Sequence, residues 1–130
     1  MTQIGELYRS DDWKNEKHVP VIDFPGNLQS GNPFAVVVTV GKEIPHPNKS
    51  EHFIVWIALY FKPQGESKVY EMGRMQFSAH GATTDGPNSV ILHTDPQAVF
   101  QISLDRPGTL LATSYCNIHG LWESEREVSF

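Results

Sequence analysis

The feature that most constrains the fold is a succession of short runs of β-branched and aromatic residues, separated by turns rich in proline and glycine. Phe53–Phe61 is apolar throughout, which is typical of a central strand buried between two layers. No amphipathic helical period extends beyond a turn or two. The pattern therefore predicts an all-β fold, an immunoglobulin-like antiparallel β-sandwich of about seven strands. The other expected strands are Val19–Phe24, Phe34–Val40, Val69–Phe77, Val90–Leu92, Ala98–Leu104 and Thr109–Tyr115.

The length and charge of the chain limit its class further. Its 130 residues are expected to form one domain, residues 1–130, with enough chain to bury a core. The formal net charge of −5 argues against a nucleic-acid partner, which normally requires a basic face. No apolar run approaches the ~18 residues of a membrane span, so no membrane partner is expected. One cysteine and an N-terminus without the pattern of an export signal favour the cytoplasm.

The segment Ser114–Trp122 contains the only cysteine of the chain, Cys116, and a histidine three positions later, His119. A single cysteine cannot form an internal disulfide. Cys116 is therefore a small buried hydrophobic residue, a nucleophile or a metal ligand. If a strand ends near Cys116, its thiol and the His119 imidazole can turn toward the same point.

Four of the six histidines are predicted to lie on loops or strand ends: His18, His46, His52 and His119. Prolines on both sides of His46 restrict the backbone there. Because strand ends converge at the two edges of a sandwich, several loops can bring ligands to one point. The remaining two, His80 and His93, have no such setting, and we interpret them as structural or surface residues.

Four imidazoles and one thiolate favour iron over the other common metals. Structural zinc is satisfied by four ligands, so one donor would be left over. Blue copper uses two histidines, one cysteine and a weak axial methionine, but no methionine follows His119. Iron accepts five protein ligands and keeps a sixth position for chemistry.

Three strings of the sequence resemble a known family. They are EKHVP (Glu16–Pro20), GKEIPHPNKSEH (Gly41–His52) and SYCNIHGLWE (Ser114–Glu123). From about Ser10 to the C-terminus, the chain is similar to the superoxide reductases, in their one-iron form also called neelaredoxins. The N-terminal desulforedoxin-like domain of the two-iron members is not expected here, in agreement with the absence of a C-x-x-C pair.

The resemblance implies one mononuclear non-haem iron that alternates between Fe2+ and Fe3+. It implies Cys116 as the axial thiolate, a sixth position that Glu16 occupies in the ferric state, and Lys17 near the open face. Backbone N–H groups of Asn117 and Ile118 are expected to point at the Cys116 sulfur. The equatorial ligands would be His18, His46, His52 and His119.

The activity implied by the resemblance is that of an oxidoreductase that detoxifies superoxide under oxidative stress. Superoxide, one electron and two protons would give hydrogen peroxide, with Lys17 guiding proton delivery. The electron would come from an external donor such as a rubredoxin, since the chain shows no second redox centre. Members of the family form dimers and tetramers, so a homo-oligomer is expected.

Two other classes of protein remain as alternatives. A cupredoxin-like electron-transfer protein would share the architecture and the Cys and His ligands without turning over a substrate. The missing methionine argues against it, and Lys17 has no obvious role there. A non-catalytic β-sandwich binding module would have scattered histidines and no tightly bound metal. Dismutase activity is also conceivable, although a dismutase has no obvious need for a carboxylate that closes its ferric site.

Overall fold

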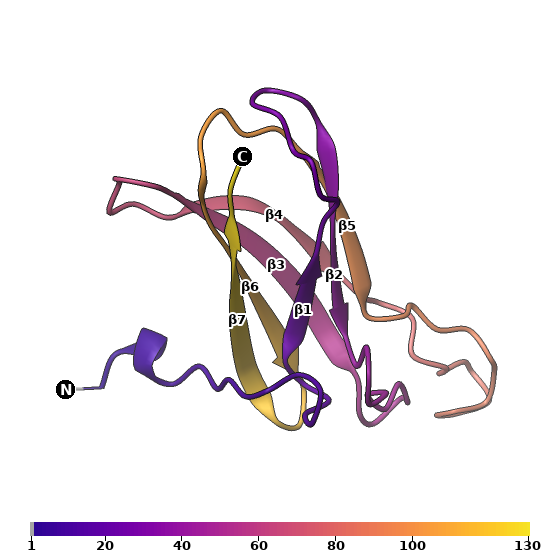
Figure 1. The fold of residues 1–130 in the computed structure, drawn as a ribbon. Helices are drawn as coiled ribbons and strands as arrows, with labels where there is room; N and C mark the ends of the chain where they lie inside the picture. Colours follow the sequence, from indigo (N-terminus) through magenta and orange to yellow (C-terminus); the bar gives the residue numbers. More distant parts are fainter. Residues whose placement is uncertain (1) are drawn as a thin grey trace.

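Two antiparallel sheets form the sandwich in the computed structural model, which describes residues 2–130 (Figure 1). One sheet has the strand order β1-β2-β5 and the other has the order β4-β3-β6-β7. A 3-10 turn, η1 (Ile4–Glu6), precedes them. The strands are β1 (Pro20–Asp23), β2 (Phe34–Val40), β3 (Ile54–Pro63), β4 (Tyr70–Gln76), β5 (Gln97–Ile102), β6 (Gly108–Cys116) and β7 (Gly120–Val128).

The core lies between the two sheets and follows from the side-chain alternation of the strands. In β2 every second residue is buried, so Val36 and Val38 turn inward while their neighbours are partly exposed. Ile57 and Leu59 of β3 meet them from the opposite sheet. Each such aliphatic side chain contributes about 1.5–3 kcal/mol when it is fully buried.

The predicted fold class is confirmed, and six of the seven expected strands match β1 to β6 within a few residues. The strand expected at Val90–Leu92 is wrong. This segment belongs to the long connection between β4 and β5, and Ile91 is 96% exposed. The seventh strand is instead β7, which the sequence analysis missed.

Most of the candidate ligands lie at one end of the sandwich. Figure 1 shows the segment before β1, the loop between β2 and β3, and the turn between β6 and β7 at the same lower end of the molecule. β6 and β7 pair as far as Cys116 and Gly120, which leaves a turn of three residues between them. Gly120 has a φ of +81°, the left-handed conformation that such short hairpin turns require of one residue.

Within residues 2–130, no helix has the length and apolar character needed to cross a membrane.

Candidate metal centre

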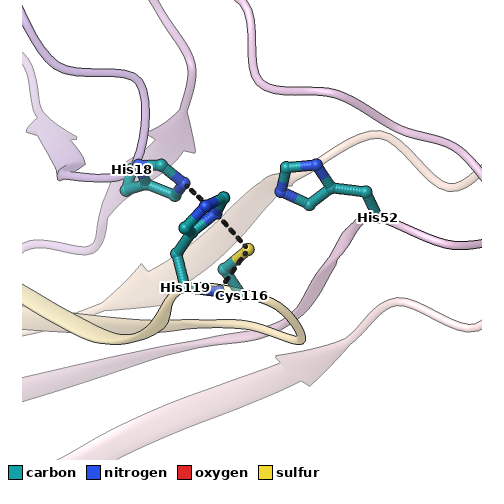
Figure 2. A group of neighbouring side chains, drawn as sticks. All are labelled: His18, His52, Cys116 and His119. Carbon is teal, nitrogen blue, oxygen red and sulfur yellow. Dashed lines mark hydrogen bonds between the residues drawn. The ribbon is translucent and has the colours of Figure 1, made fainter.

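Four imidazole rings form a closed circuit at this end of the sandwich. The centroid of His18 lies 4.8 Å from that of His46, and His46 lies 4.8 Å from His52. His52 lies 5.0 Å from His119, and His119 returns to His18 at 4.7 Å. Donor atoms of three of these rings and of Cys116 all lie within 4.8 Å of one another. Figure 2 shows His18, His52, His119 and Cys116 turned toward a common centre.

The four rings come from three segments of the chain. His18 precedes β1, whereas His46 and His52 lie on the loop between β2 and β3. His119 ends the turn between β6 and β7. The four histidines and the cysteine predicted to ligate a metal are thus close together. His46 is outside the tightest group of four donors, but its ring lies beside both His18 and His52.

Two of the rings are oriented by hydrogen bonds on their outer side. Nδ1 of His18 lies 2.5 Å from Oε1 of Glu16. Nδ1 of His46 lies 2.7 Å from the carbonyl oxygen of Pro47 and donates to it. In both rings Nε2 is therefore the nitrogen left for the centre of the cluster. The carbonyl of His18 also accepts a hydrogen bond from the buried Ser114 hydroxyl, at 3.1 Å.

The turn between β6 and β7 presents the thiol of Cys116, which is fully buried. The backbone N–H of His119 donates to Sγ of Cys116 at 3.4 Å, and Nδ1 of His119 lies 3.8 Å from the same sulfur. The expected N–H donors to the sulfur were Asn117 and Ile118. For Asn117 the expectation is wrong, because its N–H donates to the carbonyl of Phe53 at 3.2 Å.

Several nitrogens of the cluster lack the partners that buried polar atoms normally have. Nε2 of His46 and Nε2 of His52 are buried without a hydrogen bond to any of the residues that the structure describes. Nε2 of His18 and Nδ1 of His119 face each other at 3.1 Å, where only one of them can donate. A cation at the centre would satisfy all these lone pairs at once, so the donor set fits a bound metal ion.

The electrostatic environment keeps the rings available as ligands. Burial lowers the pKa of His18, His46 and His52, and for His46 the value falls to about 4. These imidazoles are therefore neutral near pH 7 and keep a free lone pair. The positive charge of Lys17 acts in the same direction on all three rings, so its ammonium group lies within electrostatic reach of the cluster.

Glu16 lies on the outer side of the cluster. Its Oε1 accepts the backbone N–H of His18 at 2.7 Å in addition to its contact with the His18 ring. Burial alone would raise the pKa of the Glu16 carboxyl, but the hydrogen bonds to His18 lower it below its ordinary value. The structure thus places this carboxylate on the far nitrogen of a candidate ligand. Its expected place as a sixth ligand stays a prediction.

Trp122 is a contact residue of the cluster that the sequence analysis did not single out. Its indole stacks on the His18 ring, with centroids 4.8 Å apart and planes inclined by 12°. Its Nε1 donates to the carbonyl of His119 at 3.2 Å. Trp122 therefore touches two candidate ligands that are 101 positions apart. The sequence feature that could have identified Trp122 is its position three residues after His119, inside the segment that contains Cys116.

The remaining histidines lie apart from this cluster, as predicted. Nε2 of His80 donates to the carbonyl of Phe77 at 2.8 Å, and the ring stacks on Phe53. His93 is exposed, and its backbone pairs with His80 in an isolated bridge.

Comparisons with known proteins agree with this geometry. A family profile described as desulfoferrodoxin matches residues 10–125, a range that includes every candidate ligand. The superoxide reductase of Pyrococcus furiosus is 53% identical over 122 residues, which cover 94% of this chain and 96% of that protein. The neelaredoxin of Megalodesulfovibrio gigas is 46% identical over 124 residues, which cover 95% of each chain. The reduced superoxide reductase (neelaredoxin) of Archaeoglobus fulgidus has a solved structure with a TM-score of 0.89 and 52% identity. It matches over 95% of this chain and 99% of that one.

Proposed function

The chain belongs to the desulfoferrodoxin family, and on this premise we propose that it is a superoxide reductase, an oxidoreductase that converts superoxide to hydrogen peroxide. The observation that carries the proposal is the closed circuit of four imidazoles beside one buried thiol. This is a donor set with one ligand more than structural zinc needs. It also lacks the axial methionine expected of blue copper.

The residues proposed to hold one iron per chain are the five that the structure brings together. Iron held there would supply the electron that reduces superoxide by cycling between its ferrous and ferric states. Because the imidazoles are neutral, only the Cys116 thiolate offsets the charge of the metal, and a ferrous site keeps a net positive charge. The proposed ligands are His18, His46, His52, His119 and Cys116.

Lys17 is proposed to attract the substrate and to guide proton delivery. Superoxide is an anion and the chain carries a net charge of −5, so the attraction has to be local. The charge of Lys17 acts on three of the four imidazoles, which supports a place beside the metal. Reduction consumes two protons per superoxide, and Lys17, a half-buried residue, would deliver them with the help of a water molecule.

Glu16 is proposed to close the ferric site as its sixth ligand. A carboxylate stabilises the higher charge state of a metal better than a neutral donor does. In the structure this carboxylate hydrogen-bonds to His18 instead. Reaching the metal would therefore require Glu16 to give up its contact with the His18 ring.

The electron donor, the assembly and the compartment are also proposals. A rubredoxin-like protein would supply one electron per turnover. The chain would act as one iron-binding domain, residues 1–130, in a dimer or a tetramer, which light scattering can measure. The single free thiol, Cys116, favours the reducing cytoplasm.

The decisive experiment is metal analysis combined with the visible spectrum before and after oxidation. About one iron per chain and a thiolate-to-iron band that appears on oxidation are expected, followed by rapid reaction with superoxide in pulse radiolysis. One copper per chain with a blue band would instead indicate the cupredoxin-like alternative. One zinc per chain with no reaction would refute the proposal.

The role of Lys17 has its own test. Lys17→Ala should slow the reaction with superoxide, most strongly at low ionic strength, and leave the iron content unchanged. Lys68→Ala, which removes an exposed lysine from the connection between β3 and β4, is the matched control and should retain the wild-type rate. Equal rates in the two variants would exclude Lys17 from the reaction.

A further inference from the structure

We propose that Asn117 is a positioning residue that fixes the turn carrying Cys116 and His119 against the backbone on both sides of His52. The inference rests on the metal centre of the proposed function. Oδ1 of Asn117 accepts the N–H of Phe53 at 2.9 Å, and Nδ2 donates to the carbonyl of Glu51 at 3.0 Å. The backbone N–H of Asn117 donates to the carbonyl of Phe53 at 3.2 Å. One residue thus makes three hydrogen bonds to the two neighbours of His52.

His52 depends on its backbone more than His18 and His46 do. The outer nitrogens of His18 and His46 have hydrogen-bond partners, whereas Nε2 of His52 is buried without a hydrogen bond to any of residues 2–130. Its main chain is tied locally to Lys49, through two hydrogen bonds of 2.9 and 3.1 Å. The direction of the His52 ring toward the cluster is therefore set by how the segment Glu51–Phe53 is held. Asn117 is what holds this segment to the turn.

The sheet provides only part of this connection. β3 and β6 pair as far as Ile54 and Cys116, but the register shifts between Ile54 and Trp56. A shift of this kind interrupts the ladder and bends the strand. Beyond it, the hydrogen bonds of Asn117 continue the link between the start of β3 and the turn after β6. These hydrogen bonds hold the His52 imidazole in one position relative to Cys116 and His119, both before and after a metal binds.

The test compares metal affinity with overall stability in two variants of Asn117. Asn117→Ala removes both side-chain hydrogen bonds. Asn117→Ser keeps a hydroxyl that can serve one of the two backbone groups but cannot span both, and it changes no charge. Val128→Ala is the control, because Val128 is buried at the opposite end of β7, where it pairs with Gly108. The affinities for Fe2+ and Co2+ are measured by competition with a chelator, and the thermal midpoint is measured on each metal-free protein.

We expect Asn117→Ala to bind both metals about tenfold more weakly than wild type, the lower limit for losing a residue that orients a ligand. The metal affinity of Asn117→Ser should lie between those of wild type and Asn117→Ala. The thiolate-to-Co2+ absorption band should shift in both Asn117 variants, and Val128→Ala should keep the wild-type affinity and band despite a lower thermal midpoint. If Asn117→Ala keeps the wild-type affinity and spectrum, the inference about Asn117 is wrong, whereas the proposed function is unaffected. An equal loss of affinity in Val128→Ala would also overturn it, because the effect would then be one of general stability. A wild-type protein that binds neither metal would refute the proposed function together with the inference.

Discussion

Acid should destabilise the metal-free protein because His46 is buried as a neutral imidazole. The residue is 8% exposed, and burial lowers its pKa to about 4, whereas an unfolded chain has a histidine pKa near ~6.5. Between these two values the unfolded state binds a proton that the folded state does not bind. The free energy of unfolding should therefore fall as the pH falls below ~6.5, and it should continue to fall until about pH 4.

The size of the effect follows from the same two values. At ~1.36 kcal/mol per pKa unit, the full shift of His46 corresponds to about 3 kcal/mol, of which about 2 kcal/mol is lost by about pH 5. Burial lowers the pKa of His18 and His52 as well, so these two rings contribute with the same sign as His46. For a slope of about 2 kcal/mol per molar urea, 2 kcal/mol moves the unfolding midpoint by about 1 M.

The assay is urea unfolding of the metal-free protein at about pH 7.5 and 5, with wild type, His46→Gln and His93→Gln compared. His46→Gln should lose at least part of the acid sensitivity, because its side chain takes up no proton. His93 is exposed and lies outside the cluster, so His93→Gln should behave as wild type. If His46→Gln loses as much stability on acidification as wild type, the assignment of the effect to burial of His46 is wrong.

Three further predictions concern the same end of the fold and the core. Gly41 has a φ of +82°, and a Cβ there would lie 2.5 Å from the backbone nitrogen of His46. Gly41→Ala should therefore lower the thermal midpoint and weaken metal binding. An unchanged midpoint would contradict this prediction. Cys116→Ser should abolish the thiolate absorption band of the oxidised protein, and a retained band would mean that another group produces it. Leu110→Ala should lower the free energy of unfolding by about 2–5 kcal/mol in urea titrations, because Leu110 is fully buried in β6. Its metal content should stay at the wild-type level, since Leu110 lies about 20 Å along the strand from Cys116.

The limits of strand prediction can be explained by what each strand exposes. β2 and β3 were predicted well because inward-facing apolar residues dominate them. β7 is an edge strand and carries the charged residues that protect such an edge from pairing with another chain. These residues obscured its alternation of apolar and polar positions, although Trp122 and Val128 are both buried. The segment Val90–Leu92 has β-prone residues but no neighbouring strand, and β-propensity without a partner is not enough.

The site was predictable in its residue types and less so in its contacts. The resemblance and the loop positions of the histidines pointed to five residues that the fold does bring together. The contact between Glu16 and the His18 ring, the stacking of Trp122 and the hydrogen bonds of Asn117 were not predictable. Each of them depends on the direction of a side chain across a turn or between segments far apart in sequence. Residue types and spacing alone do not determine such directions.

The distribution of the ligand candidates over the two sheets has a consequence for how a metal enters and leaves. His18 and His46 are attached to the ends of β1 and β2, whereas His52, Cys116 and His119 belong to the other sheet. A metal bound to all five residues would cross-link the two layers. It would also close loops that span most of the chain. Because bringing such distant segments together costs loop-closure entropy, the folded sandwich presents the donors to a metal far more readily than the unfolded chain does. Release would then require the two layers to separate at this end. The lifetime of the bound metal should therefore report on the opening of the sandwich, rather than on the strength of any single bond to the metal.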